Sequence, residues 1–547
     1  MRRHLLVTVL LGTVSAFGIN AARADLVISK GHTKNVTCDA GVCNATAADA
    51  VLSVKDLASL LAASDVSVFA EGVATDITMT SPLHWASSHH LTLGAYGSLN
   101  VKSTVTVQGT AGLTITTNVA GNGGEYRLVG VGQISFWDTA SSLTINGKSY
   151  TLFNTIGSLA DAIANNPSGN YAFAMPYNAA QDGSYPGSAI PTPFHGSFDG
   201  LGNAIDKFTI FNANAPGSQL GFFYDIESDG QLSNVTLTNV SIQTSQASTG
   251  TIAADNHGTI THAYASGVNT GLSGANQRSG GLVYDNEGTI TRSHAGVDMS
   301  NALYLGGLAA LNGGTISLSD ASGNISGAQV AGGLVAESDT TISACFATGN
   351  ISLSLNENAI AGGLAGNAIG TIEQSFATGA VSVGTGTDGA RTRKPNGVQA
   401  GGLVGNNQAH IHYAYATGSV TVEAAARTRY SSIGGLVGHN EAAGTLQQTY
   451  STGAVTKIRT RKFEGGLIGY EEAPQGTELD NFWNLDTSTI TDPSHGAGNV
   501  SYDKGVKGIP DSNFRKGTMR NFDGAIWTQK SSVNNGYPYF IANPPPR

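Results

Sequence analysis

The sequence is short of charge, cysteine and proline, and these shortages exclude whole classes of protein. Charged residues make up only 12 % of the 547 residues, about half of the ~25 % usual for globular proteins. With 15 prolines and no Gly-X-Y period, the chain is not collagen. With 40 % apolar residues it is not intrinsically disordered either, because disorder requires low hydrophobicity and high charge.

Glycine is the residue in excess, at 72 of 547 residues, close to double the roughly 7 % average. A long, apolar and glycine-rich chain that is neither collagen nor disordered is typical of a β-rich protein with many turns. At this length the chain can bury a substantial core.

The first 24 residues have the features of a cleaved secretory signal peptide. The basic start Met1-Arg2-Arg3-His4 precedes an apolar run from Leu5 to Ile19 and the cleavage signature Ala22-Arg23-Ala24. An uncleaved membrane anchor is the alternative, but the run is shorter than the ~18 residues of a spanning helix. We therefore expect a mature chain that starts near Asp25, lacks a transmembrane segment, and is secreted or displayed at the cell surface. The periplasm is the alternative location.

The three cysteines fall into a pair and a single residue. Cys38 and Cys43 are separated by a glycine-containing turn, and in an exported protein this spacing favours a disulfide. Cys345 lies in a strand-like segment, where we expect a buried free thiol. None of the three resembles a catalytic nucleophile.

From about residue 250 one pattern recurs, and its most regular part is a Gly-Gly-Leu triplet. The apolar residue that ends each triplet, here called the anchor, recurs every 26 to 39 residues, which is the range of solenoids, propellers and arrays. An isoleucine or leucine follows each of the first seven anchors eight to ten residues later, and in most copies an aromatic residue follows after twelve to fourteen. The anchors are Ile252, Leu282, Leu308, Leu334, Leu364, Leu403, Leu436 and Leu467.

One copy cannot bury its own apolar face, so the copies must stack, with leucine on leucine, isoleucine on isoleucine and ring on ring. This predicts an all-β fold, a right-handed parallel β-helix. The 26-residue copies are too short for a propeller blade, and the leucine-rich repeat signature is absent. We expect glycine and asparagine to supply the positive-φ corners and the rings to face the core.

Upstream of the repeats, residues 86–152 alternate with the period of half-buried strands, whereas Val51 to Ala63 and Ile156 to Ala164 favour helices. No linker or charge block marks an internal boundary. We expect five segments, namely the signal peptide (1–24), an N-terminal cap region with the disulfide (25–85), an N-terminal part of the β-helix with decorations (86–249), the repeats (250–479) and a C-terminal capping segment (480–547).

The copies read Gly-Gly-Leu-Val-Gly-x-Asn, then Gly-Thr-Ile, then Tyr-Ala-Thr-Gly, as in Gly434 to Gly453. They resemble the GLUG-motif repeats of bacterial surface proteins related to filamentous haemagglutinin and other large β-helical adhesins. The resemblance covers about residues 85–541. It implies a β-helical surface or secreted protein with an outer-membrane exporter as a partner, and it names no ligand.

Charge is segregated along the chain. Without the signal peptide, 25 basic residues stand against 38 acidic ones, a net charge of −13, yet residues 391–462 hold nine basic and two acidic residues, a net charge of +7. Three Arg-Thr-Arg triplets lie in the variable stretch before an anchor, the part of a solenoid repeat that often binds ligands. We call the following residues the basic ladder: Arg391, Arg393, Lys394, Arg427, Arg429, Arg459, Arg461 and Lys462.

The basic ladder suits sulfate, phosphate or carboxylate groups, so acidic glycans, lipopolysaccharide or host matrix are the expected partners. The alternative is a solvated edge that merely discourages edge pairing. We expect no nucleic-acid partner and no cofactor.

Three further features have structural interpretations. Asparagines four residues after most anchors predict a stacked amide ladder. His410 and His412 share an outer face as a two-ligand metal site, but no third ligand is evident, so we expect no metal. Trp483, Trp527 and the segment from Tyr537 to Phe540 are expected to cover the open C-terminal end.

No Gly-Asp-Ser-Gly, Gly-x-Ser-x-Gly or His-Glu-x-x-His string occurs, so a non-enzymatic, adhesin-like protein is the leading hypothesis. The alternative is a polysaccharide lyase or glycoside hydrolase on the same scaffold. A hydrolase needs paired carboxylates, and Asp255 and Asp285 occupy equivalent repeat positions but stand alone in the sequence.

Overall fold

Most of the regular secondary structure of the described residues consists of short strands that pair in parallel. The computed structural model describes residues 25–119, 121, 123–273, 277–354, 359–384, 397–423, 431–458, 462–474, 478–517, 519 and 521–546. The chain divides into two compact units. The first comprises residues up to Gly132 together with Thr144–Gly147, and the second comprises Gln133–Leu143 together with the chain from Lys148 onward. The predicted signal peptide lies outside the described residues.

The first unit is built from stacked parallel strands, a hairpin and one helix. Its five-stranded sheet has the order β12-β9-β6-β1-β4. A second row pairs β3, β5, β8 and β11 in parallel. The strands are β1 (Asp25–Ser29), β3 (Val42–Ala45), β4 (Ala50–Ser53), β5 (Val66–Ala70), β6 (Asp76–Met79), β8 (His90–Ala95), β9 (Leu99–Val101), β11 (Gly112–Thr116) and β12 (Tyr126–Leu128).

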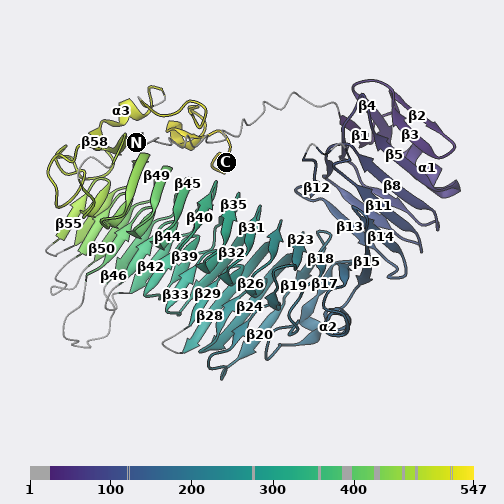
Figure 1. Ribbon diagram of the computed structural model, residues 1–547, viewed down its shortest axis with the longest axis horizontal. Helices are drawn as coiled ribbons and strands as arrows, with labels where there is room; N and C mark the ends of the chain where they lie inside the picture. Colours follow the sequence, from purple (N-terminus) through teal and green to yellow (C-terminus); the bar gives the residue numbers. More distant parts are fainter. Residues whose placement is uncertain are drawn as a thin grey trace, which may run out of the picture. The chain divides into compact units, whose positions relative to one another are not determined.

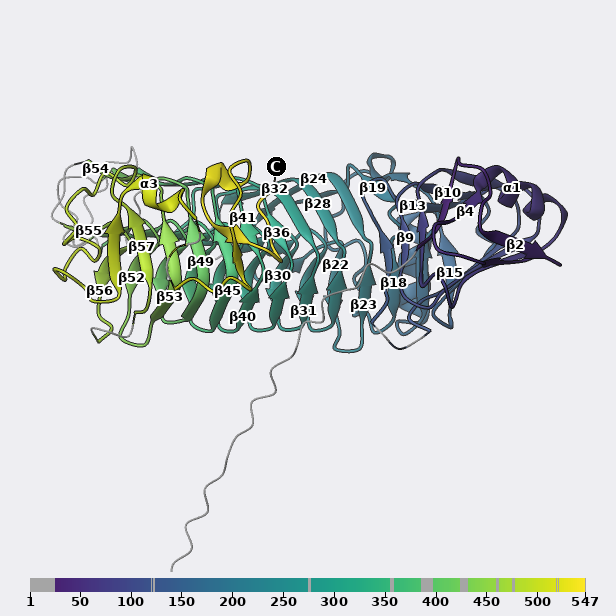
Figure 2. The same ribbon diagram turned by 90° about the horizontal axis from the view of Figure 1, so that it is seen from above.

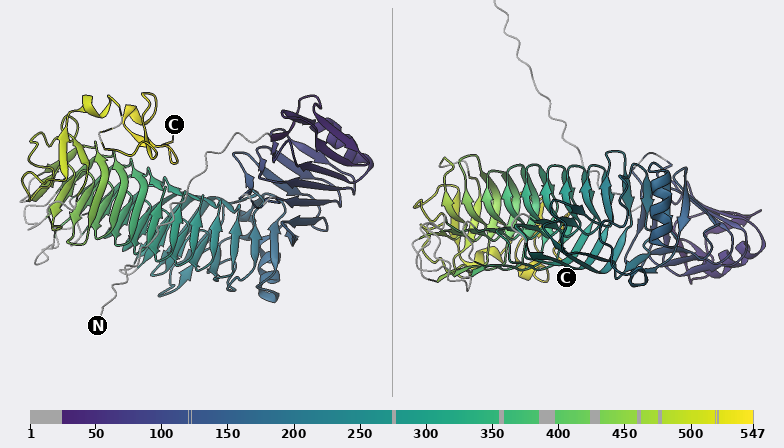
Figure 3. Two further views of the ribbon diagram at one scale, coloured as in Figure 1. Left: turned by 45° about the horizontal axis from the view of Figure 1, so that its top comes forward. Right: turned by 90° about the horizontal axis from the view of Figure 1, so that it is seen from below.

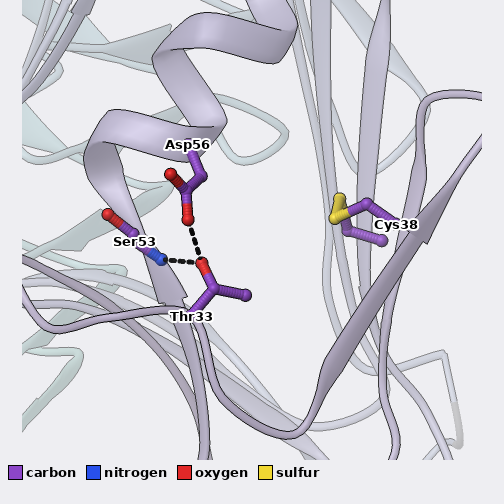
Figure 4. The surroundings of a disulfide bond; sticks show 5 residues. Thr33, Cys38, Ser53 and Asp56 are labelled. Carbon is purple, nitrogen blue, oxygen red and sulfur yellow. Dashed lines mark hydrogen bonds between the residues drawn. A yellow bond between two sulfur atoms is a disulfide. The ribbon is translucent and has the colours of Figure 1, made fainter.

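A disulfide closes the hairpin of the first unit. Strand β2 (Val36–Asp39) pairs antiparallel with β3, and this register puts Cys38 directly opposite Cys43, to which it is bonded. Nearby, the Thr33 hydroxyl donates to Asp56 and accepts the backbone N–H of Ser53 (Figure 4). These bonds hold the start of helix α1 (Val54–Ala63), one of the two helices predicted from the sequence.

The second unit is a parallel β-helix, as the repeats predict, and its strands stack coil upon coil (Figure 1). The other predicted helix, α2 (Ile156–Asn165), belongs to this unit (Figure 1). The described residues of the second unit include two nine-stranded sheets. The first sheet contains β21 (Gln219–Leu220), β25 (Ser248–Gly250), β29 (Arg278–Gly280), β33 (Tyr304–Gly306), β38 (Val330–Gly332), β43 (Ile360–Gly362), β47 (Gln399–Gly401), β51 (Ser431–Gly434) and β55 (Lys462–Gly465).

The second sheet follows each strand of the first after a sharp corner. It contains β22 (Phe223–Ile226), β26 (Ala253–Asn256), β30 (Val283–Asn286), β34 (Ala309–Asn312), β39 (Val335–Ser338), β44 (Ala365–Ala368), β48 (Val404–Asn407), β52 (Val437–Asn440) and β56 (Ile468–Glu471). The Gly-Gly pair forms the corner, and a Cβ at Gly281 would lie 1.9 Å from the carbonyl oxygen of Gly307. The doubled glycine is therefore required because backbones of successive coils pass too closely for a side chain.

The third sheet carries the isoleucine positions. Ile260, Ile290 and Ile316 pair in register and are fully buried. Its strands at these positions are β27 (Thr259–Thr261), β31 (Thr289–Thr291), β35 (Thr315–Ser317), β40 (Thr341–Ser343), β45 (Thr371–Ala377), β49 (His410–Ala416), β53 (Thr445–Ser451) and β57 (Asn481–Asn484). The anchors are fully buried in the same core, so the predicted stacking of leucine on leucine and isoleucine on isoleucine is confirmed.

The asparagine ladder is also confirmed. Asn256 donates through Nδ2 to Oδ1 of Asn286, and Asn286 donates in the same way to Asn312, each over 2.7 Å. Asn407 and Asn440 form a second run, also at 2.7 Å. All of these side chains are buried, and each Nδ2 that donates along the ladder is satisfied by the next coil. Oδ1 of Asn256, at the start of the ladder, has no hydrogen-bond partner.

The prediction about the turn residues is only partly right for the repeats, where Asn301 and Gly327 have a positive φ. None of the doubled glycines has a positive φ, whereas the residue ten positions after several anchors does, among them Leu318, Ala344 and Gln374. These residues carry side chains, for which a left-handed backbone is unfavourable. The hydrogen bonds of the strands on either side therefore hold the corner of each coil in that conformation.

The prediction that the rings face the core is wrong as well. The ring column is defined here as Tyr264, His294, Asp320, Phe346, Phe376, Tyr415, Tyr450 and Phe482, which pair in register from coil to coil. The left-handed residue two positions earlier reverses the strand alternation. The residue that follows each ring-column position, such as Ala321 or Ala377, therefore enters the core, and the ring column points outward.

The last part of the C-terminal segment covers the ring column from outside and not the open end, whereas residues 496–498 and β58 (Val506–Ile509) stack on the last coil as a cover of that end should. Trp527 and Phe540 lie on strands β59 (Trp527–Thr528) and β60 (Tyr539–Phe540) and pack against Tyr415, with centroids 6.2 and 5.4 Å away. Figures 2 and 3 show this segment lying along the coils of the repeats. Trp483 differs from the other two, because it is buried inside the solenoid.

Among the described residues, no helix is long and apolar enough to cross a membrane.

Candidate functional site

A row of three aspartates crosses the first strands of the second sheet. Asp225 on β22, Asp255 on β26 and Asp285 on β30 pair in register, and neighbouring positions of a parallel ladder are about 4.8 Å apart. The row ends in the next coil, where Leu311 takes the equivalent position. We call Asp225, Asp255 and Asp285 the aspartate row.

A cavity of about 340 Å³ opens beside the aspartate row and is lined by Gln219, Asp255, His257, Asp285 and Glu287. Gln219 comes from β21 of the first sheet, and its Nε2 donates to Oδ1 of Asp255 over 3.5 Å. Nδ1 of His257 lies 3.1 Å from Oδ1 of Asp225. The corner between the two sheets therefore brings an amide, an imidazole and several carboxylates into one polar cavity.

The electrostatics of the aspartate row are unusual at its centre. Burial raises the pKa of Asp255 to about 7, and the negative charges of Asp225 and Asp285 act in the same direction against the opposing effect of His257. Burial and then Glu287 raise the pKa of Asp285, which His257 and Arg278 lower in part. Asp255 is thus the carboxyl group of the row that can hold a proton near neutral pH.

The imidazole is shifted towards its charged form. Burial lowers the pKa of His257, but its hydrogen bond with Asp225 and the charges of Asp225, Asp255 and Glu227 outweigh burial, so the pKa is raised. A protonated Asp255 can donate to and accept from hydroxyl groups, and it can also act as a general acid.

The interpretation that Asp255 and Asp285 stand alone is wrong, because they pair in register on neighbouring strands and Asp225 pairs with Asp255 on the other side. Asp225 and His257 were missed by the sequence reasoning. The available signal was a spacing of 30 residues from Asp225 to Asp255 to Asp285. It was overlooked because the coil around Phe222 has a phenylalanine in place of the anchor leucine.

The basic ladder is not placed by the structure. Seven of its eight residues lie outside the described residues, namely Arg391, Arg393, Lys394, Arg427, Arg429, Arg459 and Arg461. The eighth, Lys462, is described only as the first backbone position of β55. The strands before the three triplets, β46 (Val381–Gly384), β50 (Val420–Glu423) and β54 (Val455–Ile458), pair in register. So do the strands that follow them. The three triplets thus belong to equivalent connections of consecutive coils, and the ladder itself stays a prediction.

The two histidines proposed as metal ligands are close together but do not reach a third ligand in the described part of the chain. The rings of His410 and His412 lie 6.5 Å apart, and Nδ1 of His410 is 2.8 Å from the Thr445 hydroxyl. They belong to no group of three or more metal-ligating side chains there. Cys345 is a buried free thiol, as expected from its strand position.

Comparison with known proteins gives one match. Residues 396–421 match the model of the GLUG motif, and they include the anchor Leu403, the ring Tyr415 and strands β47, β48 and β49. No curated protein matches the chain. The chain therefore carries a GLUG motif within its β-helical repeats.

Proposed function

We propose that this chain is an exported, non-catalytic surface or secreted protein that binds glycans. The observation that carries the proposal is the polar cavity at the aspartate row, where carboxylate, amide and imidazole groups converge on one corner of a rigid parallel sheet. Such groups hydrogen-bond to sugar hydroxyls. A scaffold of stacked coils keeps them in fixed positions without a cost of ordering on binding.

The basic ladder supplies the second contact in this proposal. Guanidinium groups in equivalent connections of consecutive coils attract sulfate, phosphate or carboxylate groups. Acidic glycans, lipopolysaccharide and host matrix are the ligand classes that carry such groups along their length. Binding through the ladder would weaken with salt, whereas binding through the cavity would depend on hydroxyl groups and much less on salt.

A glycan-binding screen of the purified chain at low and high salt tests the proposal. Asp255→Asn with Asp285→Asn is expected to weaken binding of neutral glycans about tenfold, as for the loss of one charge-assisted hydrogen bond. Arg427→Ser with Arg429→Ser is expected to weaken only salt-sensitive binding of acidic glycans. Asp161→Asn on the exposed face of α2 is the matched control. If the chain retains no glycan, or if neither double variant changes retention, the proposal is wrong.

Glycoside hydrolysis is the second candidate, and the raised pKa of Asp255 favours it. Asp225, Asp255 and Asp285 lie on neighbouring strands, and the strand spacing of about 4.8 Å is close to the ~5–5.5 Å that separates the two carboxylates in retaining glycosidases. A hydrolase would release new reducing ends from a polysaccharide, a lyase would release unsaturated ends, and Asp255→Asn would abolish release. Retention of an uncut polysaccharide supports the non-catalytic proposal instead.

A further inference from the structure

Three buried carboxylates meet where the last repeat coil joins the C-terminal segment. Glu471 ends strand β56, Glu478 precedes β57, and Asp503 precedes β58 (Val506–Ile509). One oxygen atom from each side chain lies within 4.8 Å of those of the other two. The three residues are only 4 %, 1 % and 4 % exposed.

The carboxylate of Glu471 is held in place by the end of the asparagine ladder. Asn440 donates through Nδ2 to both of its oxygens, at 2.9 and 3.1 Å, and the backbone N–H of Ala473 donates to Oε1 over 2.7 Å. Asn499 fixes the backbone at the same residue through two further hydrogen bonds of 2.7 and 2.8 Å. The carboxylate is thus oriented towards Glu478 and Asp503 before any ligand arrives.

Asp503 gives an independent indication that something is bound here. Its Oδ1 accepts a long hydrogen bond of 3.5 Å from the Gly505 N–H, and its buried Oδ2 has no hydrogen-bond partner. In the described part of the chain, no lysine, arginine or histidine forms an ion pair with Glu471 or Asp503. Buried carboxylates are normally paired with a cation or coordinate a metal.

We propose that Glu471, Glu478 and Asp503 bind one calcium ion. Calcium–oxygen distances of about 2.3–2.6 Å allow two ligand atoms of one ion to be at most ~4.6–5.2 Å apart, whereas the ~2.0–2.1 Å distances of magnesium allow only ~4.2 Å. The three oxygens lie within 4.8 Å of one another, which one calcium ion can span. Magnesium in addition keeps several waters and is seldom held by an all-protein set of carboxylates, whereas calcium accepts one. The all-oxygen ligand set is also the one that calcium prefers over zinc or copper.

The ion would connect three segments that the fold brings together at this end of the solenoid. Glu471 belongs to the last coil of the second sheet, while Asp503 belongs to the chain that continues into the C-terminal segment over the ring column. Calcium would therefore fasten the origin of that segment to the repeats. This inference does not depend on the proposed glycan binding.

Calorimetric titration and thermal unfolding of the full chain, freed of metal with a chelator and measured near neutral pH, test the proposal. We expect one calcium ion to bind per chain and to raise Tm, because a ligand of the folded state stabilises it by mass action. Glu471→Gln and Asp503→Asn should each weaken calcium binding at least about tenfold. Glu423→Gln, at an exposed position of β50, is the matched control and should respond like the unaltered chain.

Folding of the variants is checked in the same experiment, because each variant is compared with the unaltered chain in chelator. Replacing one carboxyl group of the buried cluster by an amide removes a buried acidic group, so the metal-free Tm of each variant should be equal or higher. A chain that binds no calcium and shows no change in Tm would mean that protons neutralise the three carboxylates, and the proposal would be wrong. Tighter binding of magnesium than of calcium, or an undiminished calcium response in both variants, would overturn it too.

Discussion

The two halves of the ring column occupy equivalent positions yet have different environments. In the earlier coils Tyr264 is 39 % exposed, and Nδ1 of His294 lies within hydrogen-bond distance of Oδ2 of Asp320, at 2.6 Å, where a ring stack would otherwise stand. In the later coils Phe376, Tyr415 and Tyr450 are fully buried and stack face to face with centroids 4.7 and 5.0 Å apart. The repeat fixes the position of each side chain, and the C-terminal segment determines whether that position is surface or interior.

The presence or absence of this cover also explains why the ring column is apolar only in its later part. Rings on the outside of a solenoid are costly unless something covers them, and the chain supplies the cover from Phe514, Phe522, Trp527, Tyr537 and Phe540. The earlier coils have no such cover among the described residues and carry polar groups in the column. The same earlier coils hold the aspartate row on the neighbouring sheet.

The largest expected loss of stability comes from removing the aromatic cover over the later half of the ring column. Trp527→Ala removes a side chain that is 1 % exposed and packs against Phe540 and Phe522 at 4.3 and 4.7 Å, so it should lower the free energy of unfolding by about 3–5 kcal/mol. Denaturant titration measures this. Trp137→Ala, at a residue 60 % exposed, should change it by less than about 0.5 kcal/mol. Equal effects of the two substitutions would show that the cover is not stabilising.

The next effect separates two tyrosines of the covered half. The Tyr450 hydroxyl donates to the Pro538 carbonyl and accepts from Asn534, so Tyr450→Phe should cost about 1–2 kcal/mol of folding free energy. The buried Tyr415 hydroxyl has no hydrogen-bond partner, so Tyr415→Phe should be neutral or stabilising. Thermal unfolding of both variants checks the contrast, and a larger loss for Tyr415→Phe would contradict the assigned hydrogen bonds.

A pH-dependent effect is expected in the open half. The pKa of Asp255 is raised to about 7 by burial and by Asp225 and Asp285, so the folded chain holds a proton there that the unfolded chain releases near its usual pKa of 3.8. Stability from this group is therefore lost as pH rises from about 4 to about 7. Asp255→Asn should raise Tm above neutral pH and change it little near pH 4. A Tm difference that is the same at both pH values would contradict the raised pKa.

The smallest effect is expected at the exposed end of the ring column. Tyr264 stacks on His294 at 5.2 Å but is 39 % exposed, so Tyr264→Ala should cost less than about 1 kcal/mol. The same denaturant titration measures it. A cost that approaches that of Trp527→Ala would mean that the two halves of the ring column contribute equally to stability. That result would contradict the claim that the C-terminal segment makes the later half different.

Much of the fold could be predicted because the repeats identify equivalent residues without any knowledge of the structure. Positions such as Ile290 and Asn286 recur with one period, and stacking follows because a single coil cannot bury its own face. The side on which the rings lie could not be predicted in this way. Strict alternation after Ile316 places Asp320 inward, but the positive φ of Leu318 reverses the alternation. Leucine rarely adopts a positive φ, so the sequence contains no signal of this reversal.

The two candidate sites were harder to predict for a different physical reason. Asp225, Asp255 and Asp285 recur every 30 residues. The burial and the nearby charges that raise the pKa values of Asp255 and Asp285 arise only when the coils stack in register. Glu471, Glu478 and Asp503 have no repeat relationship at all, and only chain packing at the end of the solenoid brings them together.

The sequence by itself determined the period, the stacking of like residues and the parallel β-helix, because these follow from local pattern and from burial of each coil's apolar face. Tertiary structure alone decided which face carries the rings, which of them are covered and which carboxylates meet. Those properties depend on distances between segments far apart in the chain, and a repeat pattern does not encode such distances.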